Sequence, residues 1–346
     1  MNDFNMGGRL AAGCALALCL AGAGLSGAEK PVNLKLGTLA PMGSSYHKSL
    51  QIMGEKWRNV SGGTVRLTIY AGGTQGGESD MVGLMQTGSL DAGLLTTIGL
   101  SEIERGVSGL QSMPMSFRTL EEVDYVGERL RPMLEKRLAA KGYVVLFWSD
   151  SGWVRFFTTA PVLRPADLRK LKIFSWAGDT HQYDAWKASG FNPVSLETAG
   201  IPQGFLSGTI NAISTPPLFA LASQIDSQAK HMLDLNWAPL VGAMVVRTKS
   251  WERIPTETRQ ALMESAVEAG QRVKAEGRAE NERAVQAMVK RGLQVHKVTP
   301  EAEAEWQAEV DKAQDQFRGK IVPEDVYDEA QRLIREFRTK GGGKPK

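Results

Sequence analysis

Residues 32–37, Val-Asn-Leu-Lys-Leu-Gly, alternate apolar and polar side chains, and the segment after them, Ala40-Pro-Met-Gly-Ser-Ser45, breaks that pattern. The alternation predicts a half-buried strand, and the serines cap a predicted helix over residues 46–60. Residues 64–70, Thr-Val-Arg-Leu-Thr-Ile-Tyr, repeat the strand pattern. A strand, a helix and a second strand in this order are typical of a parallel α/β unit.

The same alternation continues along the chain. The glycine-rich residues 71–77 lead into a predicted helix over residues 78–88, and further strands are predicted at residues 90–97, 143–148, 154–159, 171–176, 209–214 and 293–298. This order predicts an α/β fold with mostly parallel sheets. The helical pattern over residues 256–291 is too long for an ordinary globular helix, so we expect it to bridge two lobes.

The start of the chain has the layout of a secretory signal peptide. An apolar run over residues 10–25 follows Arg9 and ends at Ser26-Gly27-Ala28. We therefore predict a signal peptide over residues 1–28, cleaved after Ala28; an uncleaved membrane anchor is the alternative. Both cysteines, Cys14 and Cys19, lie inside this segment, so the exported chain would contain no disulfide.

Composition narrows the class of protein. The chain of 346 residues is long enough for two lobes, and its 41 Lys and Arg against 38 Asp and Glu are spread evenly, apart from a basic tail over residues 340–346. An excess of +3 without clustering argues against nucleic acid as the partner.

Signals for an enzyme are weak. The glycine-rich residues 72–77 lack the Gly-Lys-Ser/Thr ending of a phosphate-binding loop, and Glu102 and Glu104 are explained by a charged helix start. The four histidines have no metal-ligand spacing: His47, His181, His231 and His296. We expect no enzymatic activity, no metal and no cofactor.

Five segments occur in an order and at spacings that match one known family. They are residues 34–45, 61–73, 86–91, 161–172 and 206–212. Together they resemble the substrate-binding proteins of tripartite ATP-independent periplasmic (TRAP) transporters, the DctP-type P subunits. The resemblance covers about residues 32–330.

The resemblance implies a two-lobed periplasmic binding protein fold that closes on a small organic ligand by a hinge motion. It divides the chain into a first lobe of residues 29–152 plus about 241–280, and a second of residues 153–240 plus about 281–330. Residues 331–346 would form the end of a C-terminal helix and a flexible basic tail. We expect the hinge near residues 150–153 and 235–242.

The resemblance also implies a partner. A monomeric protein in the periplasm would deliver its ligand to a small Q-type and a large M-type TRAP membrane subunit. The alternative is a ligand-sensing protein of the same fold that docks on a membrane signalling receptor.

The residue at the end of the predicted strand 171–176 departs from the family pattern. An arginine there usually grips a ligand carboxylate with bidentate geometry, but this chain has Phe174. A second family arginine falls on Val154. Arg155 could replace it only if the strand register shifts, because adjacent side chains point to opposite faces. We therefore expect a divergent subgroup whose ligand is more apolar or neutral than a simple dicarboxylate.

Aromatic residues stand where a ligand would be held. Trp153, Phe174 and Trp176 lie near strand ends, and Trp237 follows a hinge segment, so we predict that they and Val154 line an aromatic pocket. Packing in the core is the alternative for each.

Four more candidates follow predicted strands at their carboxyl ends, where open α/β sheets bind ligands: Tyr46, Thr96, Thr215 and Pro216. The alternative role is a helix contact for Tyr46, a satisfied strand-end hydroxyl for Thr96, and a loop-breaking segment for Thr215 and Pro216. Asp179 either orients a ligand or caps the helix that begins near Thr180.

Overall fold

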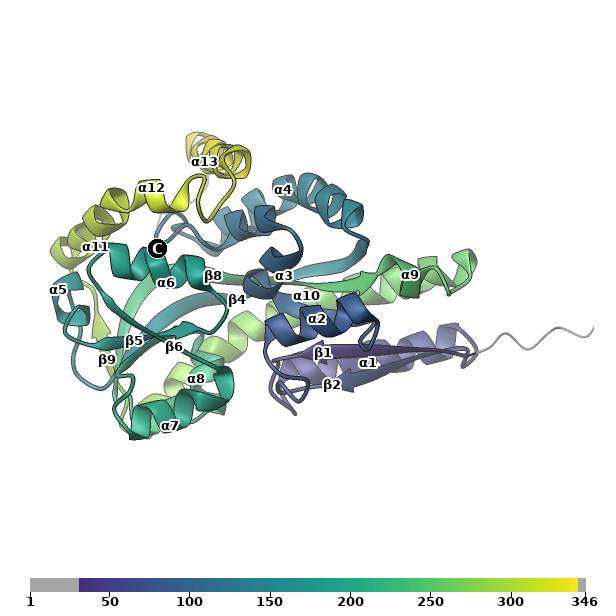
Figure 1. Cartoon of the computed structure of the whole chain (residues 1–346), viewed down its shortest axis with the longest axis horizontal. Helices are drawn as coiled ribbons and strands as arrows, with labels where there is room; N and C mark the ends of the chain where they lie inside the picture. Colours follow the sequence, from purple (N-terminus) through teal and green to yellow (C-terminus); the bar gives the residue numbers. More distant parts are fainter. Residues whose placement is uncertain (1–30, 342–346) are drawn as a thin grey trace, which may run out of the picture. The chain divides into compact units, whose positions relative to one another are not determined.

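The computed structural model describes residues 31–341, and within them nine strands form one mixed sheet (Figure 1). The strand order is β2-β1-β3-β8-β4-β7-β5-β6, with β9 beside β8. The strands are β1 Val32–Thr38, β2 Val65–Tyr70, β3 Ala92–Thr96, β4 Tyr143–Thr158, β5 Lys172–Trp176, β6 Asn192–Leu196, β7 Ala212–Thr215, β8 His231–Arg247 and β9 Gln294–Lys297. In this described part, five of the eight strand pairings are parallel, as predicted.

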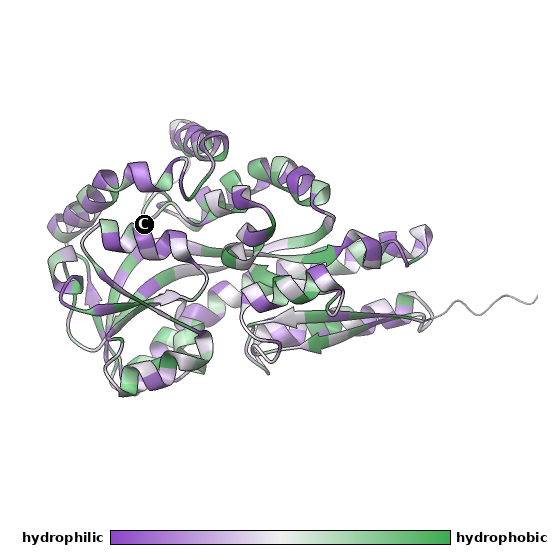
Figure 2. Cartoon of the chain, in the orientation of Figure 1, coloured by the Kyte–Doolittle hydropathy of each residue, from purple (hydrophilic) through white to green (hydrophobic). Residues whose placement is uncertain are grey.

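Helices and short 3-10 turns connect the strands. The helices are α1 Ser45–Val60, α2 Glu78–Thr87, α3 Thr97–Ile103, α4 Leu120–Ala140, α5 Pro165–Leu168, α6 Thr180–Ala188, α7 Ile201–Leu206, α8 Pro217–Ala222, α9 Thr248–Trp251, α10 Thr256–Lys290, α11 Pro300–Lys312, α12 Gln314–Phe317 and α13 Glu324–Thr339. The 3-10 turns are η1 Arg105–Leu110, η2 Thr198–Gly200 and η3 Ile225–Ser227. Figure 2 shows that apolar residues concentrate on the central strands, whereas α11 to α13 carry many hydrophilic residues.

The first strand and helix form as the sequence predicts. Ser44 caps α1 by accepting a hydrogen bond from the His47 backbone N–H at 3.3 Å. Three apolar side chains at helical spacing, Leu50, Met53 and Trp57, are buried against the sheet. The indole of Trp57 also donates to the Leu262 carbonyl at 3.0 Å, which joins α1 to α10.

The long antiparallel pair β4 and β8 differs from the prediction. The two short strands predicted at residues 143–148 and 154–159 are one strand, β4, because register shifts rather than a break absorb the polar residues between them. Gly152, at φ +77°, lies in one of these irregular segments. The two predicted hinge segments lie within β4 and β8 and pair with each other, Asp150 opposite Val241 and Trp153 opposite Pro239.

The long helix α10 packs against α1, β4 and α8, and so contacts segments from both of the predicted lobes. Glycines permit its close approach. A Cβ on Gly270 would lie 2.6 Å from the Phe147 side chain, and one on Gly277 would lie 2.2 Å from the Tyr46 hydroxyl oxygen. These two positions hold the helix directly against β4 and α1.

The C-terminal helix α13 packs on α4 and η1. Arg338 joins the two helices, since its Nε lies 2.6 Å from Oε1 of the fully buried Glu122. Residues 324–330, which we assigned to the second lobe, therefore pack with the first. The division into lobes stays a prediction, and the signal peptide and residues 342–346 lie outside the described residues. Among residues 31–341, no helix combines the length and apolar character that a membrane span requires.

Candidate functional site

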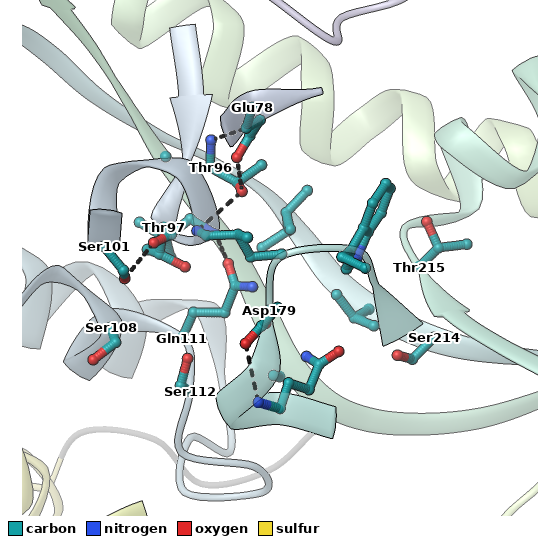
Figure 3. A pocket seen from close by; sticks show the side chains of 18 of the residues that line it. Glu78, Thr96, Thr97, Ser101, Ser108, Gln111, Ser112, Asp179, Ser214 and Thr215 are labelled. Atoms are coloured by element: carbon teal, nitrogen blue, oxygen red, sulfur yellow. Dashed lines mark hydrogen bonds between the residues drawn. The ribbon is translucent and has the colours of Figure 1, made fainter. Parts of the chain in front are cut away.

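A pocket of about 600 Å³ opens where several strands end (Figure 3). The carboxyl ends of β1, β3, β5 and β7 contribute Thr38, Thr96, Trp176 and Thr215 to its wall. Parallel α/β sheets place ligand sites at these ends, because the loops there diverge and leave a crevice. Residues of helices α6 and α11 also line the pocket.

Seven of the nine residues predicted to bind the ligand line this pocket. They are Tyr46, Thr96, Val154, Trp176, Thr215, Pro216 and Trp237. The structure thus brings together residues that lie up to 191 positions apart in the chain, between Tyr46 and Trp237. Their contact with a ligand stays a prediction.

Phe174 does not line the pocket, contrary to our expectation. Its side chain is 2% exposed and belongs to a core cluster with Phe157 and Ile213. Trp176 lies two residues further along β5 and so points to the same face, nearer the strand end. The Trp176 ring packs edge-on against the Phe174 ring at a centroid distance of 4.8 Å, so Trp176 covers Phe174.

Trp153 also lies away from the pocket. The register shift between Asp150 and Trp153 turns it toward the cluster formed by α4, α13 and η1. Its neighbour Val154 faces the pocket.

Arg155 does not replace the missing family arginine in this structure. Its Nε lies 3.0 Å from Asp234 Oδ1, its Nη1 lies 3.4 Å from the Leu235 carbonyl oxygen, and it is not part of the pocket wall. Burial lowers the pKa of Arg155, and the charge of Asp234 opposes that effect. Its guanidinium is therefore already paired with two residues of β8, Asp234 and Leu235.

Glu78 is a pocket residue that the sequence did not single out. Its buried carboxylate accepts hydrogen bonds from the Thr96 N–H (2.8 Å), the Thr96 hydroxyl (2.7 Å) and the Gly99 N–H (2.9 Å). Burial raises the pKa of Glu78 against the effect of these bonds. Because Thr96 Oγ1 also accepts from the Ile98 N–H at 3.2 Å, the Thr96 hydroxyl has protein partners for both donation and acceptance.

Residues 149–151 on β4 were also missed. They fall between the two strands that we predicted, and a strand-end position next to a glycine is the signal that could have identified them. Arg278 of α10 binds the Asp150 carboxylate, and Asn281 of α10 donates to the Ser151 carbonyl and accepts from the Leu218 N–H at 2.7 Å. The long helix thus fixes this part of the wall.

Aromatic rings form another wall of the pocket. Trp186 of α6 and Trp237 of β8 stack at a centroid distance of 5.4 Å and an interplanar angle of 15°. Trp237 and Trp306 meet edge to face at 5.8 Å. Two of these rings, Trp186 and Trp306, lie inside helices, where sequence alone does not separate a pocket wall from a core contact.

Asp179 lines the pocket and caps α6. Its Oδ1 accepts from the Gln182 N–H at 3.0 Å, so the capping role predicted for it is confirmed. Burial raises the pKa of Asp179.

The charges around the pocket are mainly negative. Seven carboxylate residues line it: Glu78, Asp80, Glu102, Asp150, Asp179, Glu197 and Glu309. Arg105 is the one arginine in the described wall, and it is exposed and donates to the Lys320 carbonyl. Such a wall opposes a free anion unless Arg105 turns toward it.

A pocket with a mostly apolar lining at the strand ends of an α/β sheet is the arrangement of a protein that holds a small solute. The family model for bacterial extracellular solute-binding proteins, family 7 (DctP), matches residues 36–320. The chain belongs to this family of periplasmic solute-binding proteins, and the predicted resemblance to TRAP P subunits is confirmed.

Two characterised relatives are similar over most of the chain. The 2,3-diketo-L-gulonate-binding periplasmic protein YiaO of Escherichia coli is 27% identical over 250 residues, 69% of this chain and 73% of its own. The C4-dicarboxylate-binding periplasmic protein DctP of Rhodobacter capsulatus is 24% identical over 246 residues, with the same two shares.

A solved structure has the same fold. The TRAP periplasmic solute-binding protein of Ralstonia eutropha with bound (S)-2-acetolactate superposes with a TM-score of 0.80 at 18% identity, covering 88% of this chain and 99% of the other.

Proposed function

We propose that this protein captures a small organic solute in the pocket between the two ends of its sheet and delivers it to the membrane subunits of a TRAP transporter. The observation that carries the proposal is the pocket itself, because its wall combines Thr96 of β3 with Trp176 of β5, from the two halves of the sheet on either side of β8 and β4. The relatives with named ligands are periplasmic binding proteins, which favours transport over the signalling alternative.

Closure of the two ends on the solute is part of the proposal. The irregular pairing of residues 150–153 with β8 supplies a place where backbone angles can change, since bulges interrupt the regular ladder there. Figure 1 shows β4 and β8 running through the middle of the sheet, so a small rotation at this point moves both ends.

The proposed solute is not a simple dicarboxylate. The resemblance implies that the family holds carboxylates with arginines, and here Phe174 and Val154 stand at those positions, while Arg155 is bound to Asp234. Burying a carboxylate without such a partner costs several kcal/mol. An uncharged solute with a large apolar surface suits the rings of Trp176, Trp186 and Trp237.

Small-angle scattering tests capture and closure together. The protein is purified from periplasm and unfolded, and the solute that it releases is identified by mass spectrometry. The scattering profile of the refolded protein is then measured with and without that compound. We expect compaction when the compound is added. An unchanged profile at saturation would contradict closure, and the absence of any released or bound compound would contradict solute capture.

A further inference from the structure

Four hydroxyls in the pocket wall have no hydrogen-bond partner among residues 31–341: those of Tyr46, Thr97, Ser149 and Ser151. The three smaller residues are 1%, 7% and 6% exposed, in that order. A buried hydroxyl without a partner destabilises the folded protein. A solute or an ordered water can supply the partner that these groups lack. We name them the hydroxyl cluster.

Strand register places three members of the hydroxyl cluster near one point. Thr96 of β3 and Ser149 of β4 both pair with Gly242 of β8, from opposite sides. Neighbouring strands lie about 4.8 Å apart, so the two positions are within about 10 Å of each other. Thr97 follows Thr96 directly, and Ser151 lies two residues beyond Ser149. A side chain at Gly242 would collide with β3, since its Cβ would lie 2.4 Å from the Leu95 carbonyl oxygen.

Helix α1 supplies the fourth hydroxyl. The Tyr46 phenol lies beside Ser151, but no hydrogen bond of normal geometry joins them. Its position is fixed, because Gly277 of α10 leaves space for the ring and no more. Gln111 borders the same region of the wall; its Oε1 accepts from the Val241 N–H at 3.0 Å, which leaves its amide NH₂ as a further neutral donor (Figure 3).

We infer, on the basis of the proposed function, that the hydroxyl cluster binds an uncharged hydroxyl, carbonyl or amide group of a solute whose flat apolar body lies against Trp176. Hydroxyls both donate and accept, so they match such a group fully. No ammonium or guanidinium belongs to the cluster, and the Arg278 guanidinium that binds Asp150 is already paired with the Asp150 and Asp124 carboxylates. An anionic group placed there would have no cation of the cluster to pair with, so the solute presents a neutral group to it.

Matched pairs of neutral and anionic probes test this. The probes are 2-pyrrolidone against pyroglutamate and benzamide against benzoate, measured by titration calorimetry with the full-length exported protein. We expect each neutral member to bind more tightly than its acid. Thr97→Val and Ser149→Ala should weaken the neutral probe about three- to tenfold each, the effect of one neutral hydrogen bond. Thr97→Ser should restore binding, and Arg332→Ala, which removes an ion pair with Glu329 outside the pocket wall, should leave it unchanged.

Three results would overturn the inference. One is tighter binding of the acids that is lost in Arg105→Ala, which would place an anion at the rim and leave solute capture intact. The second is failure of both neutral probes to bind. The third is binding of a neutral probe that Thr97→Val and Ser149→Ala leave unchanged, although circular dichroism shows both variants folded. Solute capture fails separately, through the scattering and mass spectrometry experiment.

Discussion

Arg278 on the long helix α10 holds Asp150 on β4 by two hydrogen bonds, Nε to Oδ1 and Nη2 to Oδ2, each 2.7 Å long. The same guanidinium reaches Asp124 of α4 at 2.6 and 3.1 Å. One side chain thus joins a helix, the irregular part of β4 and a second helix. Because Asp150 lines the pocket, this pair also sets the shape of the wall.

Arg278→Ala should lower the free energy of unfolding by about 1–3 kcal/mol, because the buried Asp150 carboxylate loses two hydrogen bonds and keeps only the Gly152 N–H and the more distant Lys274. Urea unfolding measures the change. Arg332→Ala is the matched control, since Arg332 pairs with Glu329 at the surface and should change stability by less than about 1 kcal/mol. Equal losses in the two variants would show that the Arg278 pair has no special structural role.

Gly277→Ala should destabilise the protein by about 1–3 kcal/mol, because the added Cβ would lie 2.2 Å from the Tyr46 hydroxyl. Tyr46→Phe removes that oxygen and should recover part of the loss in the double variant. Gly127→Ala in α4 is the control, because nothing lies within 4 Å of its added Cβ and alanine favours the helix by about 1 kcal/mol. Thermal unfolding of the four variants measures this, and a neutral Gly277→Ala would contradict the close approach.

Phe174→Ala and Trp176→Ala should separate folding from binding. Phe174 is in the core, so its loss should cost about 3–5 kcal/mol of stability. Trp176→Ala should keep the fold and weaken binding by about 1–3 kcal/mol. The ligand for this measurement is the solute that the purified protein releases on unfolding. Calorimetry and urea unfolding of both variants measure the split. Normal solute binding by Trp176→Ala would assign that ring to the core instead.

Asp179 gives a prediction that depends on pH. Burial raises its pKa in the folded protein, so its contribution to stability is fully present below the unfolded-state pKa and is lost as the pH rises through the folded-state pKa. Asp179→Asn keeps a capping oxygen but has no charge to bury. The variant should therefore gain stability relative to the wild type as the pH rises from 4 to 8, in urea unfolding.

The control for this prediction is Asp179→Ala, which removes the charge and also the bond to the Gln182 N–H, so it should be less stable than Asp179→Asn by about 1 kcal/mol at every pH in that range. If the stability of Asp179→Asn relative to the wild type falls or stays constant as the pH rises, the raised pKa is contradicted.

Local patterns predicted the elements that depend on local interactions. The alternation in residues 32–37 and the cap at Ser44 gave β1 and α1 correctly, and the long helical pattern gave α10. The strand β8 was missed because its segment Asn236-Trp-Ala-Pro239 has no two-residue alternation, and pairing with β4 along its length stabilises it instead.

The sequence predicted those pocket residues that lie at or just after the carboxyl ends of strands. Tyr46, Thr96 and Trp176 lie in the pocket because they follow strands. Phe174 was placed wrongly because the family position says nothing about a second aromatic residue covering it. The free hydroxyl of Thr97 and the occupied hydroxyl of Thr96 differ only through Glu78, and no sequence pattern reveals that partner.

The position of β8 has a consequence for how the molecule is assembled. This strand lies between β3 and β4, which precede it in the chain, so a growing polypeptide cannot join those two strands until residue 247 has been made. Trp306 and Phe317, which complete the pocket wall, come later still. An N-terminal fragment that ends before β8 holds two separate edges with exposed backbone groups. The native protein is therefore reached late, by insertion of a middle strand rather than by addition from one end.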